Sequence, residues 1–508
     1  MKPKHYLAID QGGHATRAIV FDSNGTALGE HSIPITTNRP SPDRVEHDAE
    51  EMAQSVHDAV AGLAAELGSE AKYVVAAGFA TQRSSVAFWD RDSGEALAPI
   101  ASWQDRRAAD ELQSIASGAD AEIARITGLR VSPHYGANKL RWFLENHSKV
   151  MEAASAGRLC CGPLASYLLA RSLRESPCYA DPANASRTLL WDVHTKDWSE
   201  YLTSLFRIPR AVLPQAVPSR FEYGTLALGE YVVPVTVCTG DQSAAIFAAG
   251  ALDEEAAYVN IGTGAFIQRP TRRAHPQATP LLQSVVWDDG HSGLRVLEGT
   301  INGAAGALVE YIEPEAADWS SKLNAWLQTV ENPPLFLNGV SGLAAPFWVP
   351  DFQSCFLSSE GARTEPGIDA RAVAVAESVV FLLQENVRVL QEKGEPVERF
   401  LVTGGLANHD ELCKRLANLS GCEVLRARYS EATARGLCYL LRSTADTSSA
   451  EGSDRSHSTA NEESWQAAAG EPDRFVPEAA PGLHKRYERW HTELMQRIAP
   501  PHGQDTSK

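Results

Sequence analysis

Runs of apolar residues separated by polar turns predict strands and helices in alternation along most of the chain. Three short strands are predicted at residues 5–10, 16–21 and 26–33. A Gly-containing turn, Gly12-Gly13-His14-Ala15, separates the first two, and Asp22-Ser23-Asn24-Gly25 joins the last two as a hairpin. The chain therefore opens with an antiparallel meander.

A helix is predicted after this meander. Asp48 suits the position that caps a helix N-terminus, and Gly68 suits the position that ends one. Apolar residues between them recur at helical spacing: Met52, Val56, Val60, Leu63 and Leu67. A buried strand at 73–80 follows and ends in Thr81-Gln82-Arg83-Ser84, at the sheet edge where α/β proteins bind ligands.

The second half of the chain repeats this order of elements. Strands are predicted at 258–261 and 265–268, followed by Leu297-Glu298-Gly299. A long helix at 369–393 leads to a strand at 399–403, which opens into a pair of glycines. The pattern indicates an α/β protein with two related halves.

One segment interrupts the pattern. Residues 444–463 are rich in Ser, Thr, Ala, Asp and Glu and hold no large apolar residue, so we expect a mobile, dispensable surface loop. Beyond it, residues 475–497 predict an ordered tail that ends in a helix.

Composition narrows the class of protein. A chain of 508 residues with 44% apolar residues suits about two to four globular domains. It has no continuous apolar run of the roughly 18 residues that a membrane helix needs, and no apolar signal region, so we expect no membrane insertion and a cytoplasmic location. The net charge of −18 argues against a nucleic-acid partner, and eight scattered cysteines suit reduced thiols.

Candidate chemistry lies in two Gly-containing turns about 250 residues apart. The turn after Asp10 and the turn Gly262-Thr263-Gly264 both join two strands, and such turns let backbone N–H groups approach a phosphate. Asp241 stands at a predicted strand-to-helix corner just before the second turn. A nucleotide held between two related domains, as in a kinase, fits this arrangement.

Each of these residues also has a purely structural interpretation. Asp241 could only cap the helix predicted at 242–249, and Asp10 could only form an Asx turn. Arg83 could be an ion-pair partner, and Trp103 and Phe266 could be core aromatics. The residues alone leave these alternatives open.

A set of segments nearly end to end resembles the FGGY carbohydrate kinase family, and within it the glycerol kinase branch. The first-half segments are Asp10-Gln11-Gly12, 44–48, Thr81-Gln82-Arg83, 103–107 and 181–188. The second-half segments are Gly240-Asp241-Gln242, 262–266, 342–348 and Gly404-Gly405. The resemblance implies an α/β, two-domain actin-like (Hsp70-like) ATPase fold with ribonuclease H-like domains and an active-site cleft between them.

The same resemblance implies a division of the chain. Residues 1–243 would form the N-terminal kinase domain, 244–443 the C-terminal nucleotide-binding domain, 444–463 the loop, and 464–508 a tail whose helix packs on the core. A homodimer is compatible with it.

The resemblance also implies roles for particular residues, with ATP and Mg²⁺ as cofactors. Asp241 would be the catalytic general base, and Asp10 and Asp241 would hold the metal. The nucleotide would contact Gly12, Gly13, His14, Arg17, Thr263, Gly306, Glu310, Gly405 and Asn408. The substrate would contact Arg83, Ser84, Trp103, His134, Tyr135, Gln242 and Phe266.

Departures from the family pattern concern the substrate. Ser84 stands where glycerol kinases have Glu, and His134 stands where they have Tyr, with Tyr135 beside it. His14 stands where the first phosphate turn usually carries a hydroxyl. We expect an ATP-dependent kinase for a small polyol or ketose. The alternatives are a glycerol kinase with an altered pocket, and a kinase-like sensor that binds nucleotide without phosphotransfer.

Overall fold

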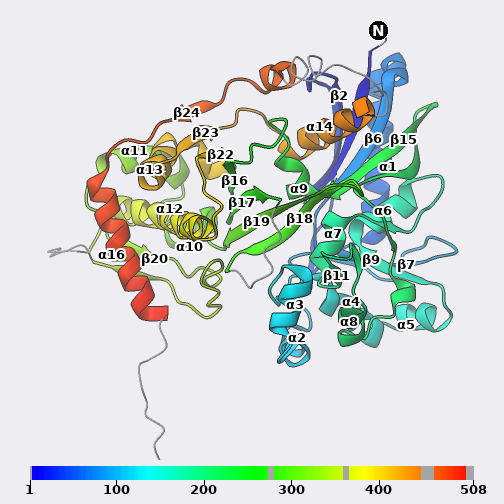
Figure 1. Ribbon diagram of the computed structural model, residues 1–508, viewed down its shortest axis with the longest axis horizontal. Helices are drawn as coiled ribbons and strands as arrows, with labels where there is room; N and C mark the ends of the chain where they lie inside the picture. Colours follow the sequence, from blue (N-terminus) through cyan, green and yellow to red (C-terminus); the bar gives the residue numbers. More distant parts are fainter. Residues whose placement is uncertain (1–2, 273–279, 359–364, 448–462, 499–508) are drawn as a thin grey trace, which may run out of the picture.

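The computed structural model describes residues 3–272, 280–358, 365–447 and 463–498, which fold around two β-sheets (Figure 1). The first sheet has the order β14-β15-β6-β1-β2-β3. Its strands are β1 (His5–Gln11), β2 (Ala15–Asp22), β3 (Ala27–Pro34), β6 (Val74–Thr81), β14 (Arg220–Leu228) and β15 (Tyr231–Gly240). β1, β2 and β3 form the antiparallel meander predicted from the sequence, and β6 and β15 run parallel to β1.

The second sheet repeats this arrangement and has the order β18-β19-β17-β16-β22-β23-β24. Its strands are β16 (Ala256–Ile261), β17 (Ala265–Thr271), β18 (Leu282–Asp288), β19 (Gly293–Ile301), β22 (Arg399–Thr403), β23 (Glu423–Arg426) and β24 (Asp473–Phe475). Here β16, β17 and β19 are the antiparallel strands, and β22 and β23 run parallel to β16. The predicted α/β fold of two related actin-like halves is confirmed.

Strand register explains why the ends of distant segments meet. In the first sheet Asp10 pairs with Ala80, and Thr81 pairs with Gly240, so β1, β6 and β15 end at one edge. In the second sheet Asn260 pairs with Thr403, which aligns the end of β16 with the end of β22. The segments that follow these strands carry the residues predicted to bind ligands.

A third, smaller sheet and a group of helices extend the first half. The sheet has the order β4-β5-β8-β7-β9, with β4 (Asn38–Ser41), β5 (Arg44–His47), β7 (Val86–Asp90), β8 (Ile100–Ala101) and β9 (Leu159–Pro163). The helices are α2 (Ala109–Ala116), α3 (Asp120–Thr127), α4 (Gly136–Asn146), α5 (Ser148–Ser155), α6 (Leu164–Ser172), α7 (Pro182–Ala185) and α8 (Glu200–Leu205). Two two-stranded sheets also lie in the first half: β10 (Tyr179–Ala180) with β13 (Gln215–Ala216), and β11 (Trp191–Asp192) with β12 (Asp197–Trp198). A further two-stranded sheet, β20 (Leu335–Leu337) with β21 (Cys355–Leu357), belongs to the second half.

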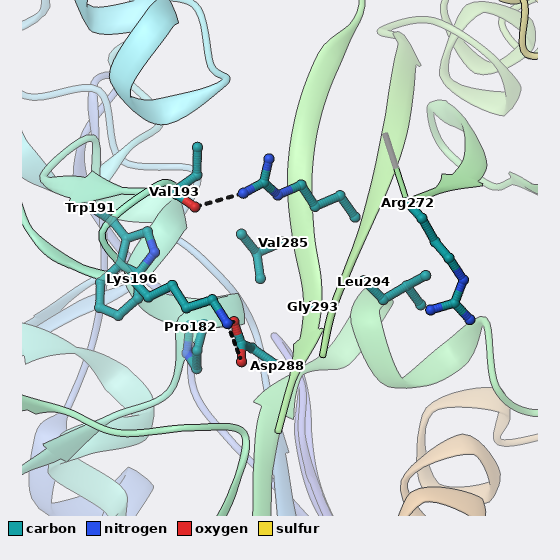
Figure 2. A pocket seen from close by; sticks show the side chains of 10 residues that line it. Pro182, Trp191, Val193, Lys196, Arg272, Val285, Asp288, Gly293 and Leu294 are labelled. Atoms are coloured by element: carbon teal, nitrogen blue, oxygen red, sulfur yellow. Dashed lines mark hydrogen bonds and ion pairs between the residues drawn. The ribbon is translucent and has the colours of Figure 1, made fainter. Parts of the chain in front are cut away.

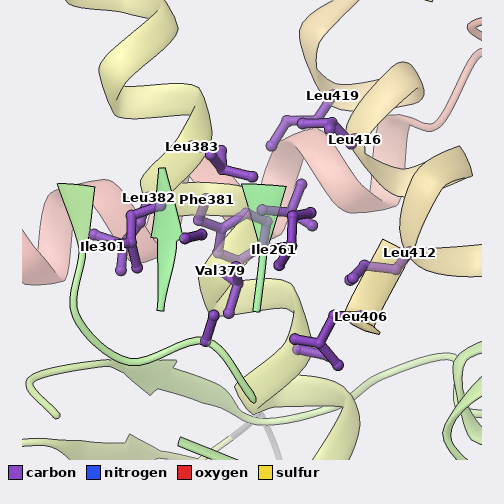
Figure 3. Close-up of a cluster of buried hydrophobic side chains, with 14 of the residues drawn as sticks. Ile261, Ile301, Val379, Phe381, Leu382, Leu383, Leu406, Leu412, Leu416 and Leu419 are labelled. Carbon is purple, nitrogen blue, oxygen red and sulfur yellow. The ribbon is translucent and has the colours of Figure 1, made fainter. Parts of the chain in front are cut away.

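The two long predicted helices are present. α1 (Ala49–Leu67) begins after Asp48, whose carboxylate accepts a hydrogen bond from the Glu51 amide, and it ends at Gly68 with φ 51°. In the second half α12 (Ile368–Glu392) packs with α10 (Ala305–Tyr311), α11 (Trp319–Thr329) and α13 (Asp410–Ser420). Figure 3 shows its side chains, such as Phe381 and Leu383, packed among residues of the sheet and of α13.

α14 (Ala432–Thr447) belongs to the second half in sequence but packs on the first sheet (orange in Figure 1). Leu437 and Leu441 lie in one apolar cluster with Tyr6 and Ala80. The predicted loop at 444–463 is wrong at both ends, because residues 444–447 complete α14 and residue 463 begins a short helix at 463–469. Residues 448–462 lie outside the described residues.

The C-terminal residues of the described chain pack on both halves. β24 extends the second sheet, and α16 (Pro481–Ile498) buries Trp490, whose Nε1 donates to the Phe336 carbonyl at 2.9 Å. Trp465 is fully buried in the first half, with its Nε1 3.1 Å from the Ala248 carbonyl and Arg435 stacked 4.5 Å from its ring.

We predict that Trp465→Ala lowers the free energy of unfolding by about 3–5 kcal/mol, because the truncated side chain leaves a cavity and removes a buried hydrogen bond. Urea unfolding followed by circular dichroism measures the change, with Trp465→Phe as the milder control. A loss below about 1 kcal/mol would show that this tail residue does not stabilise the first half.

Candidate active site

The candidate active site is built where β1, β6 and β15 end. Asp10 lies near the end of β1, Arg83 follows β6, and Asp241 follows β15. The Arg83 Nε atom lies 3.8 Å from Asp241 Oδ1, and the Arg17 Nη1 atom lies 3.9 Å from Asp10 Oδ2. The shared sheet edge thus brings together Asp10, Arg83 and Asp241, which are far apart in sequence, and Arg17 lies beside Asp10.

Burial raises the pKa of both carboxylates. Burial, and next the negative charge of Asp241, raise the pKa of Asp10 to about 7, although Arg17 opposes this. Burial also raises the pKa of Asp241, against the effects of Arg83 and of the Gln242 amide. Asp241 keeps 28% of its side chain exposed, so its carboxylate remains accessible to a ligand.

The structural interpretations of these acids find little support. Gly240, not Asp241, occupies the N-cap position of α9 (Asp241–Ala245), and Asp241 Oδ1 accepts from the adjacent Gln242 amide at 2.7 Å. Asp10 lies inside β1 rather than in a turn. Trp103 is 41% exposed, which excludes a core role, and Phe266 is half-buried.

Arg83 connects the two halves through Glu298 of β19. Its Nη2 donates to Gln242 Oε1 and lies 3.8 Å from Glu298 Oε2, so Arg83 does make the ion pair that its structural interpretation requires. Its Nη1 is nevertheless buried and has no hydrogen-bond partner among the described residues, which leaves a donor for a ligand. Burial lowers the pKa of Arg83 to about 10.

Arg187 is the second arginine that contacts Glu298. Its Nη2 donates to Glu298 Oε2 at 2.5 Å and to Ser284 Oγ at 2.7 Å, and Tyr135 shares a hydrogen bond with it. Arg187 and Arg83 together hold the pKa of Glu298 below its usual range despite its burial. Arg187 and Glu298 were not among the predicted site residues. Arg187 lies in the segment 181–188 and Glu298 in Leu297-Glu298-Gly299, both noted in the sequence. Neither residue stands in a sequence pattern that marks it as part of a site.

Lys139 of α4 is a further residue that the sequence did not indicate. Its buried ammonium donates to three backbone carbonyls, those of Ser84 at 3.2 Å, Ser102 at 2.8 Å and His134 at 2.8 Å. These carbonyls belong to the three loops that carry the predicted substrate residues. Ser84 has φ 66°, which is uncommon for a residue with a side chain, and the bond from Lys139 fixes its carbonyl.

The two predicted phosphate turns differ in detail. In the first, the Gly12 amide donates to the Ala15 carbonyl at 3.0 Å, and Gly13 has no atom within 4 Å of the position of a Cβ. In the second, the Thr263 carbonyl accepts from the amides of Ala304 and Gly306 at 2.9 Å, which joins the turn to α10. Both turns leave backbone near solvent.

The remaining predicted residues differ in their contacts and in their exposure. Gly405 is open, and its neighbour Gly404, with φ 97°, packs against the Ile261 backbone. His134 contacts the Trp103 carbonyl through Nδ1 at 3.3 Å. His14, Glu310 and Asn408 are exposed, and no hydrogen bond joins them to Asp241 among the described residues.

A separate pocket of about 210 Å³ lies between the halves (Figure 2). Trp191, Val193 and Lys196 line it from the first half, and Val285 and Asp288 line it from β18. Lys196 pairs with Asp288 at 2.8 Å. None of its lining residues belongs to the predicted site.

Comparison with known protein families shows which family the chain belongs to. Residues 5–248 match the N-terminal domain of the FGGY family of carbohydrate kinases, and residues 257–443 match its C-terminal domain. The chain belongs to this family. The predicted enzyme class, an ATP-dependent phosphotransferase with a sugar or polyol hydroxyl as acceptor, is thereby confirmed.

Several relatives are glycerol kinases. The chain is 33% identical over 447 residues to one from Dechloromonas aromatica, covering 85% of this chain and 88% of the relative. It is 31% identical over 446 residues to glycerol kinase 1 of Pseudomonas aeruginosa, covering 86% and 89%.

Solved structures of proteins with lower sequence identity to this chain have the same fold. A Plasmodium falciparum glycerol kinase superposes with a TM-score of 0.86 at 21% identity, over 98% of this chain and 99% of that one. A xylulose kinase from Rhodospirillum rubrum gives 0.83 at 19% identity, over 97% and 98%. Among the described residues, no helix is long and apolar enough to cross a membrane.

We predict that Asp10→Asn stabilises the ligand-free enzyme at pH 8 by on the order of 1–4 kcal/mol. Because the pKa of Asp10 rises from 3.8 in the unfolded chain to about 7 in the fold, its contribution to stability is full below pH 3.8 and is lost as the pH rises through about 7. Urea unfolding in EDTA at pH 4 and pH 8 measures this, and the gain should shrink at pH 4. A variant that is less stable than the parent at pH 8 would contradict the assignment.

We predict that Lys139→Met raises the KM for the acceptor by about tenfold or more, because three charge-assisted hydrogen bonds to the substrate loops are lost. The KM for ATP should change little, and that split separates loop positioning from general destabilisation. Lys149→Met, on the exposed side of α5, is the matched control. An equal rise in both KM values would contradict a positioning role.

Proposed function

We propose that this kinase transfers the γ-phosphate of ATP to a hydroxyl of a small polyol or ketose, with Asp241 as the general base. The observation that carries the proposal is the position of Asp241, whose carboxylate is partly exposed at the sheet edge 3.8 Å from Arg83 and beside the Asp10 carboxylate. A carboxylate in this place can accept the proton of an attacking hydroxyl as the phosphoryl group transfers.

The environment of Asp241 supports this role. Its raised pKa, caused by burial, makes the carboxylate a stronger base than an exposed Asp, while Arg83 and the Gln242 amide act to lower that pKa. Arg83 and Gln242 are bonded to each other and would orient the acceptor hydroxyls. The free Arg83 Nη1 supplies a further donor.

Nucleotide binding is assigned to the turns at the same edges of the two sheets. Gly12, Gly13 and Arg17 would contact phosphate from the first half, and Thr263, Gly306 and Gly405 from the second. The related Plasmodium falciparum glycerol kinase was solved with ADP, which supports a nucleotide site in this fold. His14, Glu310 and Asn408 have exposed side chains. Their contacts with the nucleotide stay predictions.

The residues present fit a magnesium ion. Burial, and next the negative charge of Asp241, raise the pKa of Asp10, and a cation between the two carboxylates would offset that repulsion. No group of three or more described His, Cys, Asp or Glu side chains is arranged to hold a metal. That suits Mg²⁺, which one or two carboxylates hold together with substrate phosphates. When bound, Mg²⁺ would neutralise charge on the transferring phosphate.

The acceptor pocket favours a substrate other than glycerol. Ser84, Trp103, His134 and Tyr135 would line it, together with Phe266. Ser84 offers no carboxylate where the glycerol kinase pattern has Glu. Glycerol itself is the second candidate, because relatives at about 30% identity carry that activity in their names. A nucleotide sensor is disfavoured by the retained Asp10 and Asp241. The homodimer and the cytoplasmic location stay predictions.

We predict that Asp241→Asn lowers turnover by about 10²–10⁴, the usual contribution of general acid–base catalysis. The substitution keeps the shape of the side chain and its bond to the Gln242 amide but removes the charge that accepts the proton. ADP release with the best acceptor measures turnover, and ATP binding and melting temperature are measured on the same protein.

Affinity for ATP and melting temperature should change little, because Gly12 and Thr263 remain in place. If Asp241→Asn retains turnover within a few-fold while binding ATP normally, the carboxylate is not the base.

We predict that kcat/KM for glycerol is about tenfold to a hundredfold lower than in an otherwise identical site with a carboxylate at position 84. The reason is that Ser84 cannot make the charge-assisted hydrogen bond to a glycerol hydroxyl. A panel of C3–C6 polyols and ketoses, with ADP release as the readout, ranks the acceptors. Ser84→Glu should improve glycerol use, and Ser84→Ala is the control. Higher efficiency of the parent enzyme with glycerol than with every larger acceptor would contradict the prediction. ADP release independent of every acceptor would indicate an ATPase.

A further inference from the structure

Two cysteines outside the active site are in direct contact. Cys160 lies in β9, and Cys178 lies in the segment just before β10. Their Sγ atoms are 3.2 Å apart and share a hydrogen bond in which either thiol can be the donor. Cys160 is fully buried, whereas Cys178 is half-buried and therefore the more accessible of the two. The two sulfur atoms are close enough for a bond between them to need only a small movement.

Arg91 favours an ionised sulfur in this pair. Its Nε donates to Cys160 Sγ at 3.3 Å, and its Nη2 donates to the Ala211 carbonyl at 2.8 Å, which fixes the guanidinium. The bond from the Cys178 thiol, and next the bond from Arg91, lower the pKa of Cys160. The next residue, Cys161, is fully buried, and burial raises its pKa. Neighbouring cysteines thus differ sharply in how readily they form a thiolate.

We propose that Cys160 and Cys178 form a redox-active dithiol that closes to an intramolecular disulfide on reaction with a small-molecule disulfide such as oxidised glutathione. In the first step the Cys178 thiol passes its proton to the Cys160 sulfur through their shared hydrogen bond, and the Cys178 thiolate attacks oxidised glutathione. A mixed disulfide forms, and the glutathione thiolate that leaves takes the proton from Cys160 and becomes one reduced glutathione. In the second step the Cys160 thiolate attacks Cys178 Sγ, breaks the mixed disulfide and releases the second. The protein loses two electrons and two protons, and both appear on the two glutathione thiols.

The disulfide would join β9 to a segment that reaches the active site. Cys178 is followed by β10 and then by Asp181, whose side chain binds Asn184. Asn184 in turn donates to the Thr239 carbonyl of β15, and the same segment continues to Arg187. The cross-link would therefore restrain the backbone that places Arg187. The inference does not rest on the proposed base or acceptor, and its test needs no kinase activity.

The test is an equilibration of the full-length protein in mixtures of reduced and oxidised glutathione, followed by acid quenching, alkylation in denaturant so that buried thiols also react, and mass spectrometry. We expect two of the eight cysteines to escape alkylation, a single linked peptide pair that holds Cys160 and Cys178, and full reversal by dithiothreitol. Alkylation of all eight cysteines under oxidised glutathione would overturn the proposal, as would a linked pair made of other cysteines.

Variants resolve the two steps. Cys160→Ser should accumulate glutathione on Cys178 without a cross-link, and Cys178→Ser should form neither product. Cys161→Ser is the matched control and should cross-link as the parent does. Arg91→Gln should slow closure by about threefold or more at pH 7, because the Cys160 thiolate loses its guanidinium. Circular dichroism checks that each variant is folded. Unchanged closure in Arg91→Gln, or a cross-link that persists in Cys178→Ser, would contradict the mechanism.

Discussion

The pairing of two arginines of the first half with one glutamate of the second is the interaction on which the site depends. Glu298 comes from β19, while Arg83 follows β6 and Arg187 follows α7. All three are buried, and a buried charge without a partner is costly, so each needs the others in place. Because Arg83 also lies beside Asp241, the contact that joins the halves also sets the surroundings of the proposed base.

The parallel register of the sheets explains why the chemistry gathers where it does. Strands β1, β6 and β15 end together, so residues at or just beyond their ends lie at the same edge of the sheet. The second sheet ends its own parallel strands in glycine turns, at Gly262 and Gly404. Backbone geometry thus provides the two turns proposed to bind phosphate, and the side chains Asp10, Arg83 and Asp241 provide the charges. The same framework could serve different acceptors through the loops that carry Ser84 and His134.

Much of the fold could be predicted from the sequence, because the signals were local. The meander, α1 with its Asp48 cap, α12 and the strand before Gly404 follow from periodicity and turn residues within short windows. The packing of α14 on the first sheet could not be predicted in this way, because an amphipathic helix does not specify which sheet it covers. The error at residues 444–447 arose because small polar residues can also complete a helix whose earlier turns are buried.

The missed site residues share one property, which is that each has at least one partner distant in sequence. Arg187 and Glu298 are 111 positions apart, and Lys139 reaches the Ser84 carbonyl across 55. A buried ion pair or a lysine bonded to backbone carbonyls leaves no periodic pattern, whereas a glycine turn or a strand-end acid does. The sequence therefore indicated the residues proposed to face the ligand better than those that hold them in place.

The most direct test of this account is a double-mutant cycle between Glu298→Gln and Arg187→Met, with kcat/KM for the preferred acceptor and urea unfolding as readouts. If Glu298 joins the halves by neutralising the arginines, Glu298→Gln alone should lower kcat/KM by about a hundredfold or more, and the coupling in unfolding free energy should be about 1–3 kcal/mol. Additive effects, together with kcat/KM within threefold of the parent for Glu298→Gln, would contradict the account.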